Sequence, residues 1–319
     1  MCRALSLQTH CTRFTPGLTI AAMSRRFQIL LLLIAPVVVF GAMILVDRAF
    51  QAPGRGLDYV LRFELPPAGG EIGLPKVQGP LDASRPLVVI DAGHGGHDPG
   101  AGANGVREKD LTLALARAVR DRLLELGGVR VALTRDEDRF LLLTERSGIA
   151  RRLKADLFVS IHADSTGGPS ATARGASIYT LSARGTNEAA ERLAGRENRA
   201  DTVNGVTLED TSDTVSAILV DLSQRDTQAR SSEFAGLFLR EGAGRIAFHY
   251  GTEQSAAFVV LKSPDLPSVL IEAGYVTAPE DADRLQSVEG RAQFSAIVAQ
   301  AVRVYFARKS APVAPQSAG

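Results

Sequence analysis

The chain has 319 residues, of which 45% are hydrophobic, and its 36 basic and 35 acidic side chains leave a formal net charge of +1. This composition supports a buried core. The balanced charge argues against a nucleic-acid partner, which would need a basic surface to neutralise its phosphates. The two cysteines, Cys2 and Cys11, precede every segment with a folded pattern, so we expect neither disulfides nor a thiolate metal site in the folded part.

An uncharged apolar run dominates the N-terminal region. Residues 29–46 read ILLLLIAPVVVFGAMILV, and Arg25 and Arg26 lie upstream. This pattern predicts a signal peptide or a membrane anchor within residues 24–50. The positive flank would leave the following chain in the periplasm or on the outer face of the cytoplasmic membrane, with the membrane as a partner if the segment is uncleaved. Residues 1–23 are an extension of undecided role.

Composition separates the rest of the chain into three parts. Residues 51–84 are rich in Gly and Pro, which predicts a linker. Residues 309–319 contain mostly Ala, Pro, Ser and Gly, which predicts a disordered tail. Residues 85–308 between them carry the patterns of a single folded domain.

Strand and helix patterns alternate through this domain. Residues 87–90, Leu-Val-Val-Ile, form an apolar run typical of a strand buried on both faces. Residues 108–126 carry apolar side chains at intervals of three or four, which predicts a helix that Gly127 and Gly128 end. The other predicted strands are 129–133, 157–161, 175–181, 258–261 and 268–271, and the other predicted helices are one capped by Thr144, 188–198, 214–222 and 289–308. The alternation predicts an α/β fold with a mostly parallel twisted sheet flanked by helices.

Polar side chains stand at the carboxyl ends of three predicted strands. His94 follows the first strand, His162 ends the strand 157–161, and Glu272 ends the last strand. Glu108 opens the first helix, just beyond a glycine-rich loop. Because ligand sites of open α/β sheets lie beyond the carboxyl ends of the strands, we expect these four side chains to converge on one rim of the sheet.

Two histidines and one carboxylate are a known ligand set of catalytic zinc sites, which keep a fourth position for water. We therefore assign His94, Glu108 and His162 as ligands of Zn²⁺. Glu272 is then the catalytic base, which takes a proton from the attacking water and passes it to the leaving nitrogen. This chemistry is amide hydrolysis without a covalent intermediate, and the folded part offers neither a cysteine nucleophile nor a Gly-x-Ser-x-Gly elbow.

Each residue has a plainer interpretation when it is taken alone. Glu108 suits the N-terminus of a helix through the helix dipole, and His162 could be a structural histidine. Glu272 could be a surface acid, although an acid that ends a buried strand is unusual. Their joint placement at one rim favours the zinc interpretation.

Two further histidines and a glycine-rich loop receive a different interpretation. We predict that His97 is a loop residue and that His249 is structural, with contact to substrate as its alternative. The glycines of residues 93–105 fit neither common phosphate-binding spacing. They would instead let the backbone approach a bulky substrate and place His94.

Several short segments share the pattern of one enzyme family. Residues 89–96 (VIDAGHGG), 104–110 (NGVREKD) and 160–164 (SIHAD) resemble the three metal motifs of the zinc N-acetylmuramoyl-L-alanine amidases that act in cell separation. Residues 267–275 (PSVLIEAGY) resemble the motif of their catalytic glutamate. Residues 133–136 (LTRD) and 143–146 (LTER) resemble the connecting segment, and the resemblance covers residues 85–308 in order.

The resemblance implies a six-stranded sheet, one Zn²⁺ and a peptidoglycan substrate. The bond cleaved would join N-acetylmuramic acid to the first L-alanine of the stem peptide, during cell-wall remodelling and daughter-cell separation. Three residues depart from the family pattern, namely Ala92 for proline, Asp164 for asparagine and Ala273 for threonine, and none is a predicted ligand. The segment between the apolar run and residue 85 is too short for the wall-targeting β-domain that members of this class often carry, which leaves septal targeting open.

Residues 186–245 are long for a connection between two strands of a compact fold. They contain helical patterns, and residues 221–224 (DLSQ) resemble an insertion of regulated amidases, in which a helix covers the zinc and an activator protein moves it. The resemblance implies autoinhibition relieved by such an activator. Glu209 could occupy the open zinc position, or it could be a solvated acid in a passive wall of the substrate groove.

Two other functions compete with the amidase. A zinc peptidase that cuts the stem peptide would use the same chemistry with a different pocket. A wall-binding scaffold that has lost catalysis would usually lack a ligand or the base, whereas His94, Glu108, His162 and Glu272 are all present. Zinc content separates the scaffold from the enzymes, and the identity of the product separates the two enzymes.

Overall fold

A computed structural model describes residues 25–50, 73–103, 105–165, 173–203, 206–207 and 217–310. The chain divides into two units, at residues 1–70 and 71–319. The predicted extension 1–23, most of the linker, Glu209 and the tail beyond residue 310 lie outside the described residues.

The first unit contributes one described helix, α1 (Arg25–Phe50), with Pro36 inside it. The helix includes the apolar run 29–46. Within the described ranges, no helix combines the length and the apolar character needed to cross a bilayer.

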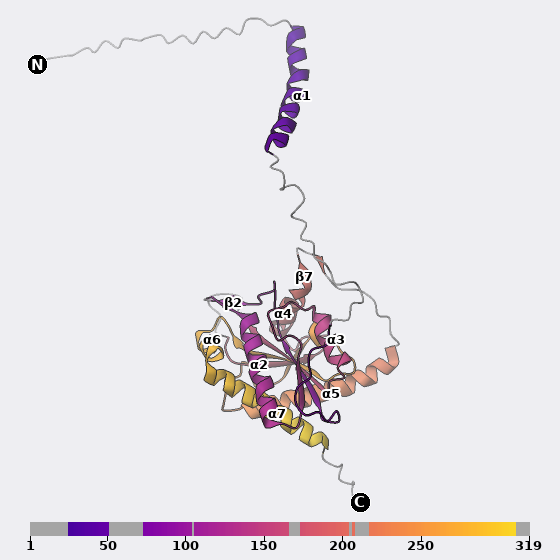
Figure 1. The fold of residues 1–319 in the computed structure, drawn as a ribbon, viewed down its shortest axis with the longest axis vertical. Coiled ribbons are helices and arrows are strands. Elements are labelled where there is room, and N and C mark those ends of the chain that lie inside the picture. Colours follow the sequence, from indigo (N-terminus) through magenta and orange to yellow (C-terminus); the bar gives the residue numbers. More distant parts are fainter. Residues whose placement is uncertain are drawn as a thin grey trace, which may run out of the picture. The chain divides into compact units, whose positions relative to one another are not determined.

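A six-stranded sheet forms the centre of the second unit (Figure 1). The strands are β1 (Leu87–Ala92), β4 (Arg130–Leu133), β5 (Leu157–Asp164), β6 (Ser177–Leu181), β9 (Gln254–Ala256) and β10 (Ser268–Tyr275). Their order is β4-β1-β5-β10-β6-β9, and every neighbouring pair is parallel except β10 and β6. The mostly parallel α/β sheet predicted from the sequence is confirmed.

Helices cover both faces of this sheet. They are α2 (Glu108–Leu126), α3 (Leu143–Arg152), α4 (Glu188–Glu197), α5 (Ala217–Gly242), α6 (Pro279–Gln286) and α7 (Val288–Ser310), with the short 3₁₀ helices η1 (Asn198–Asp201) and η2 (Val259–Leu261). Two small hairpins complete the described elements, β2 (Gly102–Ala103) with β3 (Val106–Arg107) and β7 (Thr202–Val203) with β8 (Val206–Thr207).

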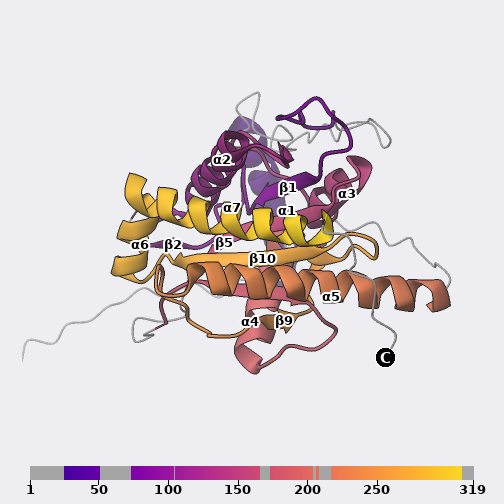
Figure 2. The same cartoon turned by 90° about the horizontal axis from the view of Figure 1, so that it is seen from below.

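The alternation of side chains along the buried strands builds two hydrophobic cores. Val88 and Ile90 of β1 face a core that α2, α5 and α7 cover, and Figure 2 shows α5 and α7 side by side over the sheet. Leu87 and Val89 point to the opposite face, where α3, α4 and η2 pack. Because both faces are covered, the central strands are apolar along their length rather than alternating.

Two details of the predicted elements are wrong. The run 258–261 is not a strand but contains η2, and the strand of this region is β9; a short apolar run does not by itself distinguish a strand from another buried segment. Thr144 does not cap α3, because it lies inside the helix. The Glu145 carboxylate instead accepts a hydrogen bond from the Leu142 N–H at 2.8 Å.

The helix predicted at 214–222 also differs in extent. In the structure, α5 begins at Ala217 and continues to Gly242, while residues 208–216 lie outside the described ranges. Phe234 and Phe238 of α5 are fully buried in the core beneath α7. This part of the segment 186–245 therefore belongs to the packed core of the domain.

Candidate metal centre

Three adjacent parallel strands bring the predicted residues to one rim of the sheet. β5 lies between β1 and β10, and Glu272 of β10 is in register with His162 of β5. His94 follows the end of β1, and Glu108 begins α2. All four side chains are buried, with at most 7% of any residue exposed. The expected convergence of His94, Glu108, His162 and Glu272 is present in the structure.

The loop after β1 places His94 through close backbone packing. His94 has a φ of 59°, a left-handed conformation that non-glycine residues rarely adopt outside functional sites. A Cβ atom on Gly93 would lie 2.5 Å from the His162 ring, and one on Gly100 would lie 2.6 Å from both Glu108 and His94. These two glycines are therefore needed because the loop passes directly against the ligand side chains.

Two buried arginines fix the carbonyl groups of this loop. Arg135 donates to the Ala92 oxygen at 2.8 Å and to the Gly93 oxygen at 2.8 Å. Arg146 donates to the Ala92 oxygen at 2.7 Å and to the His94 oxygen at 2.9 Å. The loop is thus held from both sides, which restricts the position of the His94 ring.

Four side chains present ligand atoms to one point. His94, Glu108, His162 and Glu197 each offer one nitrogen or oxygen atom, and these atoms all lie within 4.8 Å of one another. The Glu197 Oε2 atom lies 3.3 Å from His94 Nε2 and 3.1 Å from His162 Nδ1. Glu108 completes the group, with Oε2 at 3.1 Å from His94 Nε2 and Oε1 at 3.2 Å from His162 Nδ1.

This donor set fits a metal ion better than it fits a hydrogen-bond network. His94 Nε2 and Glu197 Oε2 are buried and make no hydrogen bond of acceptable geometry, although they lie within 3.3 Å of each other. Two ligands that each bind a tetrahedral ion at about 2.0–2.2 Å stand about 3.3–3.6 Å apart. The separations within the group are close to that spacing, so a small divalent cation fits between the four atoms.

The electrostatics of the group also favour a cation. Burial disfavours the charged form of both imidazoles, yet Glu108 holds the pKa of His94 well above its ordinary value. Glu197 and Glu108 likewise raise the pKa of His162 to about 9 against the effect of burial. The carboxylates therefore stabilise positive charge between the two rings, and a bound metal ion would supply that charge while both imidazoles stay neutral.

Glu272 lies beside this group without joining it. Both of its carboxylate oxygens are buried and have no hydrogen-bond partner. Burial raises its pKa well above the ordinary value, and the nearby Asp164 and Glu197 carboxylates raise it further. A buried carboxyl group with free oxygens next to a metal site is suited to accept and release a proton.

Two functional residues were missed from the sequence. Asp98 accepts the Nδ1 proton of His94 across 2.7 Å, which leaves Nε2 free to bind a metal. Glu197 contributes the fourth ligand atom from the end of α4. A signal for Glu197 was available, because it follows the buried Leu193 and Ala194 at helical spacing and so extends the buried face of an amphipathic helix.

The other two described histidines, His97 and His249, lie outside this group, as predicted. His97 is an exposed loop residue whose ring stacks on Phe140, with ring centroids 4.1 Å apart. His249 packs against Tyr250 and Tyr275, with centroids at 4.3 Å and 5.4 Å. Neither belongs to the metal-capable group.

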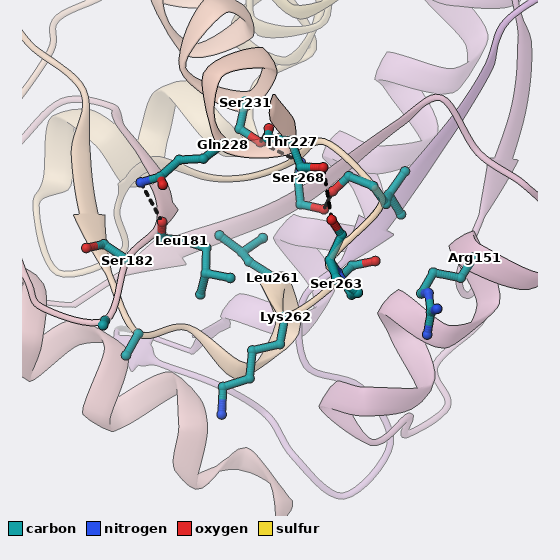
Figure 3. Close-up of a pocket in the computed structure, with 14 residues that line it drawn as sticks. Arg151, Leu181, Ser182, Thr227, Gln228, Ser231, Leu261, Lys262, Ser263 and Ser268 are labelled. Atoms are coloured by element: carbon teal, nitrogen blue, oxygen red, sulfur yellow. Dashed lines mark hydrogen bonds between the residues drawn. The ribbon is translucent and has the colours of Figure 1, made fainter. Parts of the chain in front are cut away.

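One cavity among the described residues lies away from the metal group. Its volume is about 780 Å³, and Leu181, Gln228, Leu261 and Ser268 are among its lining residues (Figure 3). Ser268 begins β10, whereas Glu272 lies further along the same strand. The cavity therefore opens at the end of the sheet opposite to the metal group.

Comparison with known proteins identifies the family of the chain. The chain is 42% identical over 225 residues to N-acetylmuramoyl-L-alanine amidase AmiA of Salmonella typhimurium, covering 70% of this chain and 77% of the relative. It is 40% identical over 236 residues to AmiA of Escherichia coli, covering 73% and 81%. The amidase Ami1 of Mycobacterium smegmatis shares the fold, with 21% identity, a TM-score of 0.51 and coverage of 70% and 97%. The model of the N-acetylmuramoyl-L-alanine amidase family (Amidase_3) matches residues 88–304, and the chain belongs to this family.

Proposed function

We propose that this protein is an autoinhibited zinc amidase that hydrolyses the bond between N-acetylmuramic acid and L-alanine in peptidoglycan, during wall remodelling and daughter-cell separation. The observation that carries the proposal is the buried group of His94, Glu108, His162 and Glu197 with Glu272 beside it. Histidine and carboxylate ligands without thiolates are a donor set of catalytic zinc sites. Membership of the amidase family supports the same reaction.

The side chains around the metal position divide the catalytic work. Zinc bound there would lower the pKa of a water molecule and polarise the carbonyl of the scissile amide. Asp98 holds the His94 ring in the tautomer that presents Nε2. Glu272 takes the proton of the attacking water and transfers it to the leaving nitrogen, which yields a carboxylate on the sugar and a free amine on L-alanine. Its raised pKa suits this role, because the carboxyl group must hold the proton between the two transfers.

Glu197 makes the resting enzyme inactive in this proposal. A catalytic zinc site keeps one position for water or substrate, whereas a site with four protein ligands is closed. Glu197 supplies the fourth ligand atom, so its carboxylate must leave before the reaction can begin. An activator protein that displaces the end of α4 would open the site, as the resemblance to regulated amidases implies. Glu209 lies outside the described residues, and Glu197 is the described acid at the fourth position.

Mass spectrometry of the products from purified sacculi tests the reaction. Because the resting site is closed, we compare variants in a Glu197→Ala background. We expect soluble stem peptides with a free L-alanine amine, and about 10²–10⁴-fold less of them after Glu272→Ala, which removes the proton-transfer group. Glu280→Ala is the matched control, because this carboxylate is exposed and pairs with Arg174 on the surface. Shortened peptides that remain on the glycan would instead identify a zinc peptidase.

The substrate places the enzyme outside the cytoplasmic membrane. Peptidoglycan lies beyond that membrane, and residues 29–46 carry the apolar pattern of an export signal or anchor. We therefore propose that the domain resides in the periplasm or on the outer face of the membrane. Digestion by protease added to spheroplasts would support this location, whereas protection until lysis would contradict it.

A further inference from the structure

Two consecutive residues at the end of α4 reach two different partners at the rim of the sheet. Glu197 contacts the histidines of the metal group. Arg196 forms an ion pair with Asp164, the last residue of β5. The Asp164 side chain is 8% exposed, while that of Arg196 is 37% exposed. The ion pair therefore links the element that carries Glu197 to the strand that carries His162.

Asp164 lies in a region rich in negative charge. The negative charges of Glu108 and Glu197 interact unfavourably with that of Asp164, and the charge of Asp164 in turn interacts unfavourably with that of Glu272. Like charges repel each other more strongly when they are shielded from water, as these buried carboxylates are. Arg196 is the guanidinium that pairs with Asp164, so its charge offsets the repulsion between Asp164 and Glu197.

Apolar packing and hydrogen bonds between neutral groups also attach α4 and the residue that follows it. Ala190, Leu193 and Ala194 are buried against the second core. Asn198, which follows Glu197, donates to the Ala257 oxygen at 2.8 Å and accepts from the Val259 N–H at 2.8 Å. The backbone is thus held on both sides of Glu197, and the charges around its carboxylate remain to decide whether that side chain stays at the metal.

We propose that the Arg196–Asp164 ion pair is the latch that keeps Glu197 on the metal ion. The inference rests on the autoinhibited amidase proposed above and names the contact that controls it. Without the Arg196 charge, Asp164 repels Glu197, and the Glu197 carboxylate leaves the metal. When the Asp164 charge is removed as well, the repulsion disappears and Glu197 returns.

The test measures how fast a chelator extracts zinc from the full-length protein, because a site with four protein ligands retains its metal longer than an opened one. We expect Arg196→Met to release zinc roughly 5–150-fold faster than the parent, the range typical of coupling between two sites. Arg196→Lys should stay near the parent, since it keeps the charge. The double variant Arg196→Met/Asp164→Asn should return toward the parent rate.

Arg192→Met is the matched control on the same helix. Arg192 pairs with Glu188 on the exposed side of α4 and touches no residue of the metal group. We expect this variant to release zinc at the parent rate. If it accelerates release as much as Arg196→Met does, general loosening of the helix explains the effect and the latch is overturned.

Release of dye from labelled sacculi separates the two proposals. Glu197→Ala should raise activity without an activator, and Arg196→Met should raise it in the same direction. No gain from Glu197→Ala would contradict autoinhibition itself. A gain from Glu197→Ala with parent-like behaviour of Arg196→Met would overturn the latch alone. A gain from Arg196→Met that Asp164→Asn does not reverse would overturn the electrostatic origin of the latch.

Discussion

Asp91 is a single buried residue that supports the loop after β1, which carries His94. Its carboxylate accepts hydrogen bonds from Thr134 at 2.6 Å, from Ser160 at 2.8 Å and from Arg146 at 3.1 Å. Neither Asp91 nor Arg146 is more than 1% exposed. The Arg146 Nη1 that pairs with Asp91 also donates to the Ala92 oxygen, and Nη2 donates to the His94 oxygen, so Asp91 neutralises and orients the group that positions His94.

Removing this carboxylate should therefore destabilise the whole domain. We expect Asp91→Ala to lower the free energy of unfolding by about 3–5 kcal/mol, because it leaves the buried Arg146 charge without its carboxylate partner. Urea denaturation measures the change. Glu125→Ala is the control, since Glu125 pairs with Arg122 on the surface and such a pair contributes about 0–1 kcal/mol. Equal losses in the two variants would contradict the structural role of Asp91.

Gly93 leaves room for the His162 ring because it has no side chain. A methyl group at this position would lie 2.5 Å from the His162 ring, which must then move from the metal position. We expect Gly93→Ala to weaken zinc affinity about 10–100-fold, as substitutions beside metal ligands often do. Competition with a zinc-binding dye gives the affinity. Gly148→Ala in α3 meets no atom within 4 Å and should keep the parent affinity, so a similar loss there would refute the steric explanation.

The elements differ in how far the sequence predicts them. The boundaries of α2 follow from its apolar spacing and the glycines after it, and the structure reproduces them. The position of His162 and Glu272 at one rim follows from the parallel order of buried strands. The position of Glu197 at the metal group could not be predicted in this way, because the burial of Glu197 depends on how α4 packs against the second core. Local periodicity gives the face of a helix but not its partner.

Helix α5 illustrates a tertiary contact that local patterns do not reveal. Phe234 packs on Tyr305 of α7 with centroids 5.8 Å apart, and Phe238 packs on Phe294 at 6.3 Å. Both phenylalanines are fully buried. The C-terminal half of α5 is thus part of the core, although a long connection between strands suggested an insertion.

The packing of α5 predicts that shortening a buried side chain in its second half strongly lowers the stability of the domain. We expect Phe238→Ala to lower the free energy of unfolding by about 3–5 kcal/mol, the usual cost of emptying a buried aromatic site. Thermal or urea unfolding measures this loss. Glu233→Ala lies on the same helix and removes only a surface pair with Arg308, so its effect should stay below about 1 kcal/mol. A loss below about 1 kcal/mol for Phe238→Ala would mean that α5 is not part of the core.

At the scale of the whole molecule, the two faces of the sheet form the hydrophobic cores and one rim of the sheet carries the metal group. The core faces are apolar, while the carboxyl ends of β1, β5 and β10 carry the ionisable groups. Helix α4 belongs to both regions, because its apolar side packs on the second core and its last residue, Glu197, reaches the metal position. We therefore propose that one zinc ion binds four protein ligands in the resting protein.

X-ray absorption spectroscopy at the zinc edge tests this claim most directly on the purified, zinc-loaded protein. We expect four nitrogen or oxygen ligands at about 2.0–2.2 Å, two of them imidazoles, and no sulfur. Glu197→Ala should keep both imidazoles and replace one carboxylate oxygen by water. A six-coordinate spectrum rich in water, or one with fewer than two imidazoles, would contradict the four-ligand centre on which the proposed autoinhibition depends.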